Sequence, residues 1–274
     1  MSDAAALVGG GVALAASASW AVSTVIIKGS IERFGARAFN LFRCSLALLL
    51  FWSTSVVLEG GRALRAMSSS DGQVLLASGV VGLALGDLLL FASVRRLGAQ
   101  PAVAMNQLSP VWSALLGWRL GTERLALPGC AGIVVVIAGV LLVVFGRAAE
   151  RRPEPGAAAG AGRAAGAGLG LAAGLLSSLC NAGAGMMTRH AVGGVGELAG
   201  STLRMTGGAA ALLAVSLVSG RLRIDTGPLR VLPAMRKEIV AVFVATYVGV
   251  LLQQAAYRAQ GGQFIIPVPT PQIV

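Results

Sequence analysis

Long apolar runs constrain this chain more than any other feature of its sequence. Five runs of about 20 residues carry almost no charge, and three further runs contain a single charged residue each. The first five cover residues 4–27, 98–118, 125–146, 164–188 and 239–257, and the other three cover 38–58, 72–94 and 198–219. Runs of this length cross a bilayer as helices and are too long for barrel strands. We therefore predict an all-α polytopic membrane helix bundle with about eight transmembrane helices.

The charge distribution agrees with a membrane protein. Only 12% of the 274 residues are charged and the net charge is +11, whereas about a quarter of the residues in soluble domains are charged. The basic residues form short clusters between the apolar runs, which is typical of loops at a membrane surface. We therefore expect the lipid bilayer, and no nucleic acid, as a partner.

A linker divides the chain into two parts. Residues 148–163 are first charged and then rich in proline, glycine and alanine, a composition typical of a flexible connection. Five predicted spans precede it and three follow. This organisation predicts a first domain over residues 1–147 and a second over residues 164–274.

The two parts resemble each other at a nearly constant offset of 161 to 163 residues. Arg43 and Arg204 each stand inside the second span of their part, and the segment 86–98 parallels the segment 249–261. Because five is an odd number, the second copy enters the membrane in the opposite orientation. The pattern predicts an inverted-topology repeat, a plan that recurs in secondary transporters.

Several motifs of the first part point to one family. They are the W-x7-K pattern from Trp20 to Lys28, the Arg43 helix, the Leu108-Ser109-Pro110 run, the Leu120-Gly121-Thr122-Glu123-Arg124 run, and the glycines Gly132 and Gly139. In these motifs the sequence resembles the EamA-like branch of the drug/metabolite transporter superfamily. The resemblance implies ten helices in two five-helix repeats and the export of small metabolites, amino acids or toxic organic compounds.

The resemblance predicts a secondary transporter that works by alternating access. Of the 22 basic residues, 20 are arginine, and this bias is typical of a GC-rich bacterial genome, so we expect the bacterial inner membrane. The resemblance implies a small-molecule substrate, and Asp87 makes the proton a candidate coupling ion. The second repeat looks incomplete, because Pro267, Pro269 and Pro271 cannot propagate a ninth helix. The alternative is a truncated or frame-shifted membrane protein that does not transport, or a subunit that needs a partner.

Charged residues inside the spans are the first candidates for the substrate cavity. Placing Arg43 or Arg204 inside a bilayer costs about 2.5–3.5 kcal/mol, so we expect each to face a cavity or an interior partner; the alternative is snorkelling to the interface. Asp87 is the one carboxylate expected within a span, and it suits proton loading. The alternatives to proton loading are a salt bridge between Asp87 and Arg43, or a position of Asp87 near the membrane–water interface.

Polar residues beside a proline form a second group. Pro110 removes a backbone hydrogen bond and should kink the fourth span near Asn106, leaving carbonyls that line a cavity or a packed interior. Glu123 matches the family motif, but we expect an architectural role in a loop ion pair or a helix cap. Lys28, Gly132 and Gly139 are likewise expected to be structural.

Three aromatic or amide residues complete the predicted cavity. Trp20 is a candidate cavity wall, with packing as the alternative. Gln254 and Tyr257 share a face of the last span with Tyr247, and we expect this face to point inward because glutamine is costly against lipid.

The sequence lacks the motifs of several other classes. It has no G-x-x-x-x-G-K-[ST] phosphate loop, only one histidine, and three isolated cysteines. Neither a His–Glu pair nor a Ser–Lys pair appears. We therefore expect no cofactor, no metal site and no enzymatic activity.

Overall fold

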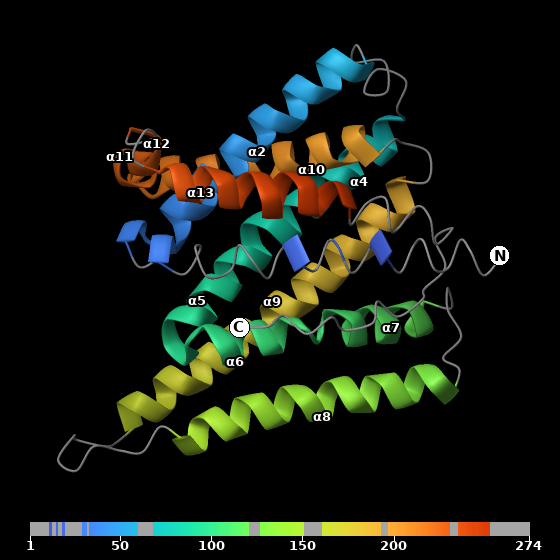
Figure 1. Cartoon of the computed structure of the whole chain (residues 1–274), viewed down its shortest axis with the longest axis vertical. Helices are drawn as coiled ribbons and strands as arrows, with labels where there is room; N and C mark the ends of the chain where they lie inside the picture. The colour runs from blue at the N-terminus through green and yellow to red at the C-terminus, as the bar shows by residue number, and fades with distance from the viewer. Residues whose placement is uncertain are drawn as a thin grey trace. The chain divides into compact units, whose positions relative to one another are not determined.

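Figure 1 shows a computed structural model of the chain. It describes residues 11–12, 15, 18–19, 29–31, 33–59, 68–120, 127–150, 161–192, 197–230 and 235–252. The described residues are helical, with turns between helices and no strand. The predicted all-α class is therefore confirmed.

Five helical segments within the described residues are long and apolar enough to cross a membrane. They are Ala36–Leu58, Ser69–Leu97, Gly129–Gly146, Gly166–Ala191 and Leu198–Val218. Each coincides, to within a few residues, with one of the predicted spans. Most of the predicted first span, 4–27, and the end of the last, 239–257, lie outside the described residues.

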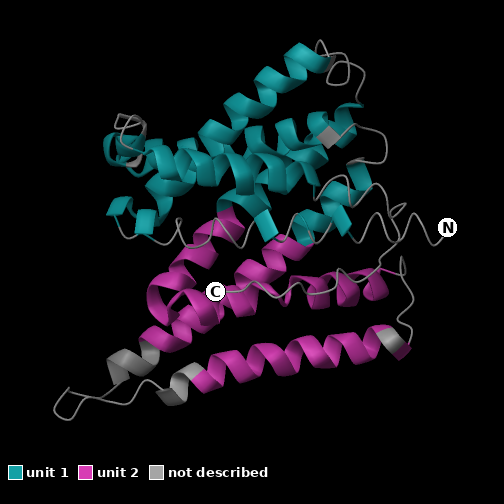
Figure 2. Cartoon of the chain, viewed as in Figure 1, with its two compact units in different colours: residues 1–84, 183–274 teal, residues 85–182 magenta. Residues whose placement is uncertain are grey.

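The chain forms two compact units (Figure 2), unit 1 from residues 1–84 and 183–274 and unit 2 from residues 85–182. Unit 1 is built mainly from α2 (Ala36–Glu59), α4 (Ser69–Gly79), α10 (Glu197–Val218), α13 (Arg236–Ala241) and the π-helical segment η3 (Val242–Val248). The short helices α11 (Leu222–Asp225) and α12 (Gly227–Arg230) also belong to it. In this unit α2 packs against α10 and η3, while α10 packs against α2 and α4.

Glycines bring α4 and α10 into backbone contact. A methyl group added at Gly79 would overlap the carbonyl oxygen of Arg204, and one added at Gly207 would overlap the carbonyl oxygen of Leu76. At Gly208 the added carbon would lie 2.9 Å from the Cβ of Leu83. Close approach through small residues is how membrane helices gain packing energy without a hydrophobic driving force. This contact joins a helix of the first sequence part to one of the second.

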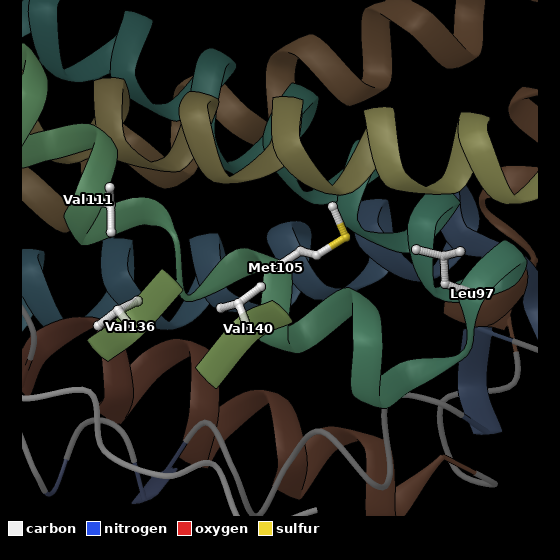
Figure 3. Close-up of a cluster of buried hydrophobic side chains, with 5 residues drawn as sticks. All are labelled: Leu97, Met105, Val111, Val136 and Val140. Atoms are coloured by element: carbon white, nitrogen blue, oxygen red, sulfur yellow. The ribbon is translucent and has the colours of Figure 1, made fainter. Parts of the chain in front are cut away.

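Unit 2 contains α5 (Asp87–Leu97), α6 (Ala99–Asn106), α7 (Ser109–Arg119), α8 (Leu127–Glu150) and the first part of α9 (Ala161–Val192). Its apolar core joins α8 to the three shorter helices (Figure 3). Five buried side chains form this core: Leu97, Met105, Val111, Val136 and Val140. The valines of α8 are four residues apart, so they share one face of that helix. The exposed side chains Val135, Leu142 and Phe145 lie elsewhere on it.

The fourth predicted span is broken at its proline. Helix α6 ends at Asn106, α7 begins at Ser109, and Pro110 stands in the first turn of α7. A proline is tolerated in the first turn because the backbone donor it lacks has no partner there. The kink predicted near Asn106 is therefore confirmed, and it separates two helices of 8 and 11 residues.

One π-helical segment interrupts the third span of each of the two sequence parts. The first, η1 (Val80–Gly86), lies between α4 and α5, and the second is η3. They begin 162 residues apart, which matches the offset of the sequence repeat. Wide turns of this kind often stand at functional positions in helices. The length and apolar composition of both spans predict ordinary helix at these places.

The compact units cut across the two predicted sequence domains. The chain passes from unit 1 to unit 2 inside η1 and returns inside α9. Most of the linker predicted over 148–163 lies outside the described residues, between the end of α8 at Glu150 and the start of α9 at Ala161. The two-repeat division therefore stays a prediction.

Candidate functional site

The first cluster, which we call the Arg43 cluster, consists of Asn40, Arg43, Cys44 and the carbonyl group of Leu83, all in unit 1. Arg43 is only 2% exposed. Its Nε and Nη2 atoms donate to the Oδ1 atom of Asn40 at 3.2 and 2.8 Å. The Nδ2 atom of Asn40 donates in turn to the carbonyl oxygen of Leu83 in η1, at 2.8 Å. This burial supports the interior alternative for Arg43 over snorkelling.

Arg204 occupies the corresponding place on α10. It is 8% exposed, and its backbone carbonyl lies at the close contact with Gly79. The two arginines thus share burial inside unit 1 as well as their sequence position. Buried guanidinium groups keep their positive charge, so both suit an anionic partner.

Asp87 is the first residue of α5 and follows η1 directly. It is half-buried. The helix does not begin anew there, because Gly86 before it also has right-handed helical backbone angles and Ser69–Leu97 forms one span.

The second cluster, which we call the asparagine cluster, lies in unit 2 where α6 and α7 meet α9. It consists of Asn106, Ser109, Trp112, Ser177, Ser178 and Asn181. The amide nitrogen of Asn181 donates to Oδ1 of Asn106 at 3.1 Å. The broken helix therefore presents polar groups, as predicted, and α9 supplies partners for them.

Serine and tryptophan side chains complete the asparagine cluster. Ser109 Oγ donates to the carbonyl oxygens of Asn106 and Ser178, at 2.8 and 3.1 Å. The indole nitrogen of Trp112 donates to Ser178 Oγ at 2.9 Å. Ser177 Oγ donates to the carbonyl oxygen of Gly86, the last residue of η1, at 2.8 Å. Carbonyls freed at the kink and at the π segment are thus paired by side chains, which a bilayer interior requires.

We expect the effects of Asn106 and Asn181 on the free energy of unfolding to depend on each other. Replacing Asn106 and Asn181 by alanine, singly and together, should give a coupling free energy of about 0.6–2 kcal/mol, the range for hydrogen bonds between membrane helices. Thermal or denaturant unfolding of the four detergent-purified proteins measures it. Additive effects of the two substitutions would contradict the 3.1 Å contact between the amides.

A hydroxyl–aromatic contact joins α2 to η3 in unit 1. The hydroxyl groups of Thr54 and Tyr247 are 2.6 Å apart, and the ring of Tyr247 lies 4.7 Å from that of Phe51. Tyr247 therefore faces a neighbouring helix rather than lipid. This agrees with an inward orientation for its face of the last span, whose other two candidates, Gln254 and Tyr257, lie outside the described residues.

Other predicted residues also lie outside the described residues, namely Trp20, Lys28 and Glu123. Both motif glycines are on α8, where Gly132 is half-buried and Gly139 is exposed. A methyl group added at Gly139 would meet no described atom within 4 Å. Across the described ranges, no three histidine, cysteine or acidic residues gather where they could hold a metal ion.

Sequence reasoning missed Asn40 and the serine pair of α9. Asn40 stands one turn before Arg43, on the same helix face, so its position next to a buried charge was the available signal. Ser177 and Ser178 carry no comparable signal, because serine is common in membrane helices that pack closely. Their role became visible only through the helices that α9 contacts.

Comparison with known proteins identifies the family. The sequence model of the EamA-like transporter family matches residues 7–145, just over half of the chain. No curated protein matches the chain significantly. The match is consistent with the drug/metabolite transporter superfamily, and together with the apolar helices it makes the chain a multi-pass membrane protein. This chain belongs to the EamA-like transporter family.

Proposed function

We propose that the chain is a secondary transporter that exports small metabolites, amino acids or drugs across the bacterial inner membrane by alternating access. The proposal adds substrate class, direction and mechanism to the family membership. It rests above all on one observation, the reciprocal packing in unit 1. Helix α2 is the second helix of the first sequence part, and it contacts η3 in the third helix of the second part. Helix α10 is the second helix of the second part, and it contacts α4 in the third helix of the first part.

Reciprocal packing agrees with a two-fold repeat, because an exchange of the two parts maps one contact onto the other. The odd number of spans in the first part is what predicts the inversion. The same exchange relates the buried residues Arg43 and Arg204, and it relates η1 to η3. Transporters built on such repeats interconvert two similar arrangements around a site near the middle of the bilayer. The sequence relation and the contacts thus favour the same mechanism.

Each cluster contains residues that the sequence argument proposes for solute binding. Arg43 and Arg204 supply positive charge for an anionic group of the solute, and Asn106 supplies amide hydrogen bonding. Asp87 is the candidate for a proton site. Trp20, Gln254 and Tyr257 remain proposed cavity residues on the sequence argument alone.

Reconstitution tests the proposal directly. Purified protein in liposomes is supplied with a panel of radiolabelled amino acids, small organic acids and cationic drugs, with and without an imposed pH gradient. We expect saturable uptake of at least one solute above that of protein-free liposomes. Opposite directions of net flux in inside-out and right-side-out bacterial vesicles measure export. No saturable uptake of any panel member by monodisperse protein would count against the proposed substrate classes.

A further inference from the structure

We propose that Asn40 is a positioning residue for Arg43 and that it ties the guanidinium group to the π-helical segment η1. The proposal rests on the proposed function, which places Arg43 in the transport cavity. Asn40 is fully buried and uses both ends of its amide: Oδ1 accepts two hydrogen bonds from Arg43, and Nδ2 donates to the carbonyl oxygen of Leu83. The side chain therefore bridges α2 and η1.

An asparagine suits this position for two chemical reasons. Its amide both accepts and donates, which neither a carboxylate nor an apolar side chain does. It is also neutral, so it orients the guanidinium without adding a negative charge beside it. An acidic residue in its place would put a negative charge beside Arg43 and would set two oxygens against each other at Leu83. The asparagine thus holds a cation in a defined place for an anionic group of the solute.

The bond to η1 gives the arrangement a second consequence. A long flexible arginine side chain loses conformational freedom when it is fixed, and here the anchor is a backbone carbonyl of an irregular helical turn. A change in the turn that moves the Leu83 carbonyl moves the Asn40 amide with it. The position of the guanidinium is therefore linked to the geometry of η1.

Cys44 provides a reporter inside the same cluster. Its sulfur lies 3.7 Å from Asn40 Oδ1 and 4.0 Å from Arg43 Nη2. The chain has three cysteines, so Cys130→Ser with Cys180→Ser leaves Cys44 as the single thiol. Cys44 is fully buried, and a water-borne reagent reaches it only when the cavity opens. Its reactivity therefore reports both the opening and the local charge.

The experiment compares two thiosulfonate reagents on the full chain in liposomes. With anionic sulfonatoethyl methanethiosulfonate or its cationic trimethylammonium counterpart, the deprotonated Cys44 sulfur takes the substituted ethylthio group as a mixed disulfide, and the broken S–SO2 bond releases methanesulfinate. Each rate constant is divided by that of the same reagent with free 2-mercaptoethanol. We expect an anionic preference of about tenfold or more, because a fixed charge in a low-dielectric cleft concentrates ions of opposite sign.

The variants separate charge from positioning. Arg43→Gln should abolish the anionic preference, and Asn40→Leu should reduce it at least threefold although Arg43 is still present, a change well within the tenfold range that a nearby charge gives. The double variant should match Arg43→Gln alone. Ser45→Ala, on the same helix, is the matched control and should keep the full preference. Size-exclusion chromatography confirms that each protein is folded.

The possible failures are distinguishable. If neither reagent modifies Cys44 in the single-cysteine protein, the cluster does not open to water, and the proposed role of Arg43 in transport fails. If Cys44 reacts with anionic preference and Asn40→Leu preserves it, the proposed function stands and the positioning role is wrong. Should Asn40→Leu not fold, Asn40→Asp replaces it. This variant should lower the preference to or below that of Arg43→Gln, and an unchanged preference would overturn the proposal.

Discussion

Replacing Gly207 by alanine is expected to prevent correct assembly of unit 1. The added methyl group would overlap the carbonyl oxygen of Leu76, and backbone atoms cannot move aside as the end of a flexible side chain can. Helices α4 and α10 would have to separate, which costs at least the 1–3 kcal/mol or so typical of overpacking. We expect loss of the monodisperse peak in size-exclusion chromatography, or a markedly lower unfolding temperature.

Gly139→Ala on α8 is the matched control for this substitution. Both positions are glycines inside apolar helices, but at Gly139 an added methyl group meets no described atom within 4 Å. Alanine is also the better helix former. We therefore expect an unchanged elution profile and unfolding temperature for Gly139→Ala. Equal damage by the two substitutions would show that the backbone contact of α4 with α10 is not what makes Gly207 sensitive.

Replacing Arg43 by alanine is expected to abolish transport without preventing membrane insertion. The guanidinium is buried, and its removal takes away the cation proposed to meet the solute. It also deprives Asn40 Oδ1 of two donors, a loss of about 1–3 kcal/mol. The uptake assay with the solute transported by the parent protein measures activity, and protease protection measures insertion.

Arg43→Lys refines this prediction. Lysine keeps the charge but lacks the planar fork that reaches Asn40 Oδ1 from two nitrogens, so we expect a raised KM with partial retention of the maximal rate. Undiminished transport by Arg43→Ala would remove Arg43 from the cavity. Loss of insertion would instead assign it a role in folding.

The sequence predicted those features of the fold that depend on local chemistry. Length and apolar composition located the spans, and Pro110 located the break between α6 and α7, because both are properties of a single segment. The burial of Arg43 and Arg204 was also expected, since a charge inside a span has few stable environments.

Features that depend on contacts between helices were not predictable in the same way. The turns of η1 and η3 look like ordinary helix in their sequence, and the side chains that pair with the carbonyls of η1 come from distant positions. The backbone contact at Gly207 gives no signal distinct from that of other glycines in the chain. The contact of Asn40 with Arg43 could have been predicted from their spacing of three residues. The hydrogen bond from Asn40 to Leu83 could not, because it joins two different helical segments.

The division of the compact units has a consequence for biosynthesis. Unit 2 is one continuous stretch of chain, so all its residues have been synthesised once residue 182 has been added. Unit 1 needs α10 and η3 to cover α2 and α4, so the earliest of these helices waits for more than half of the protein to be made. During that interval α2 holds Arg43 in the membrane without α10 beside it. Chaperones or the insertion machinery that shield α2 in this period therefore bear directly on how much functional protein the cell obtains.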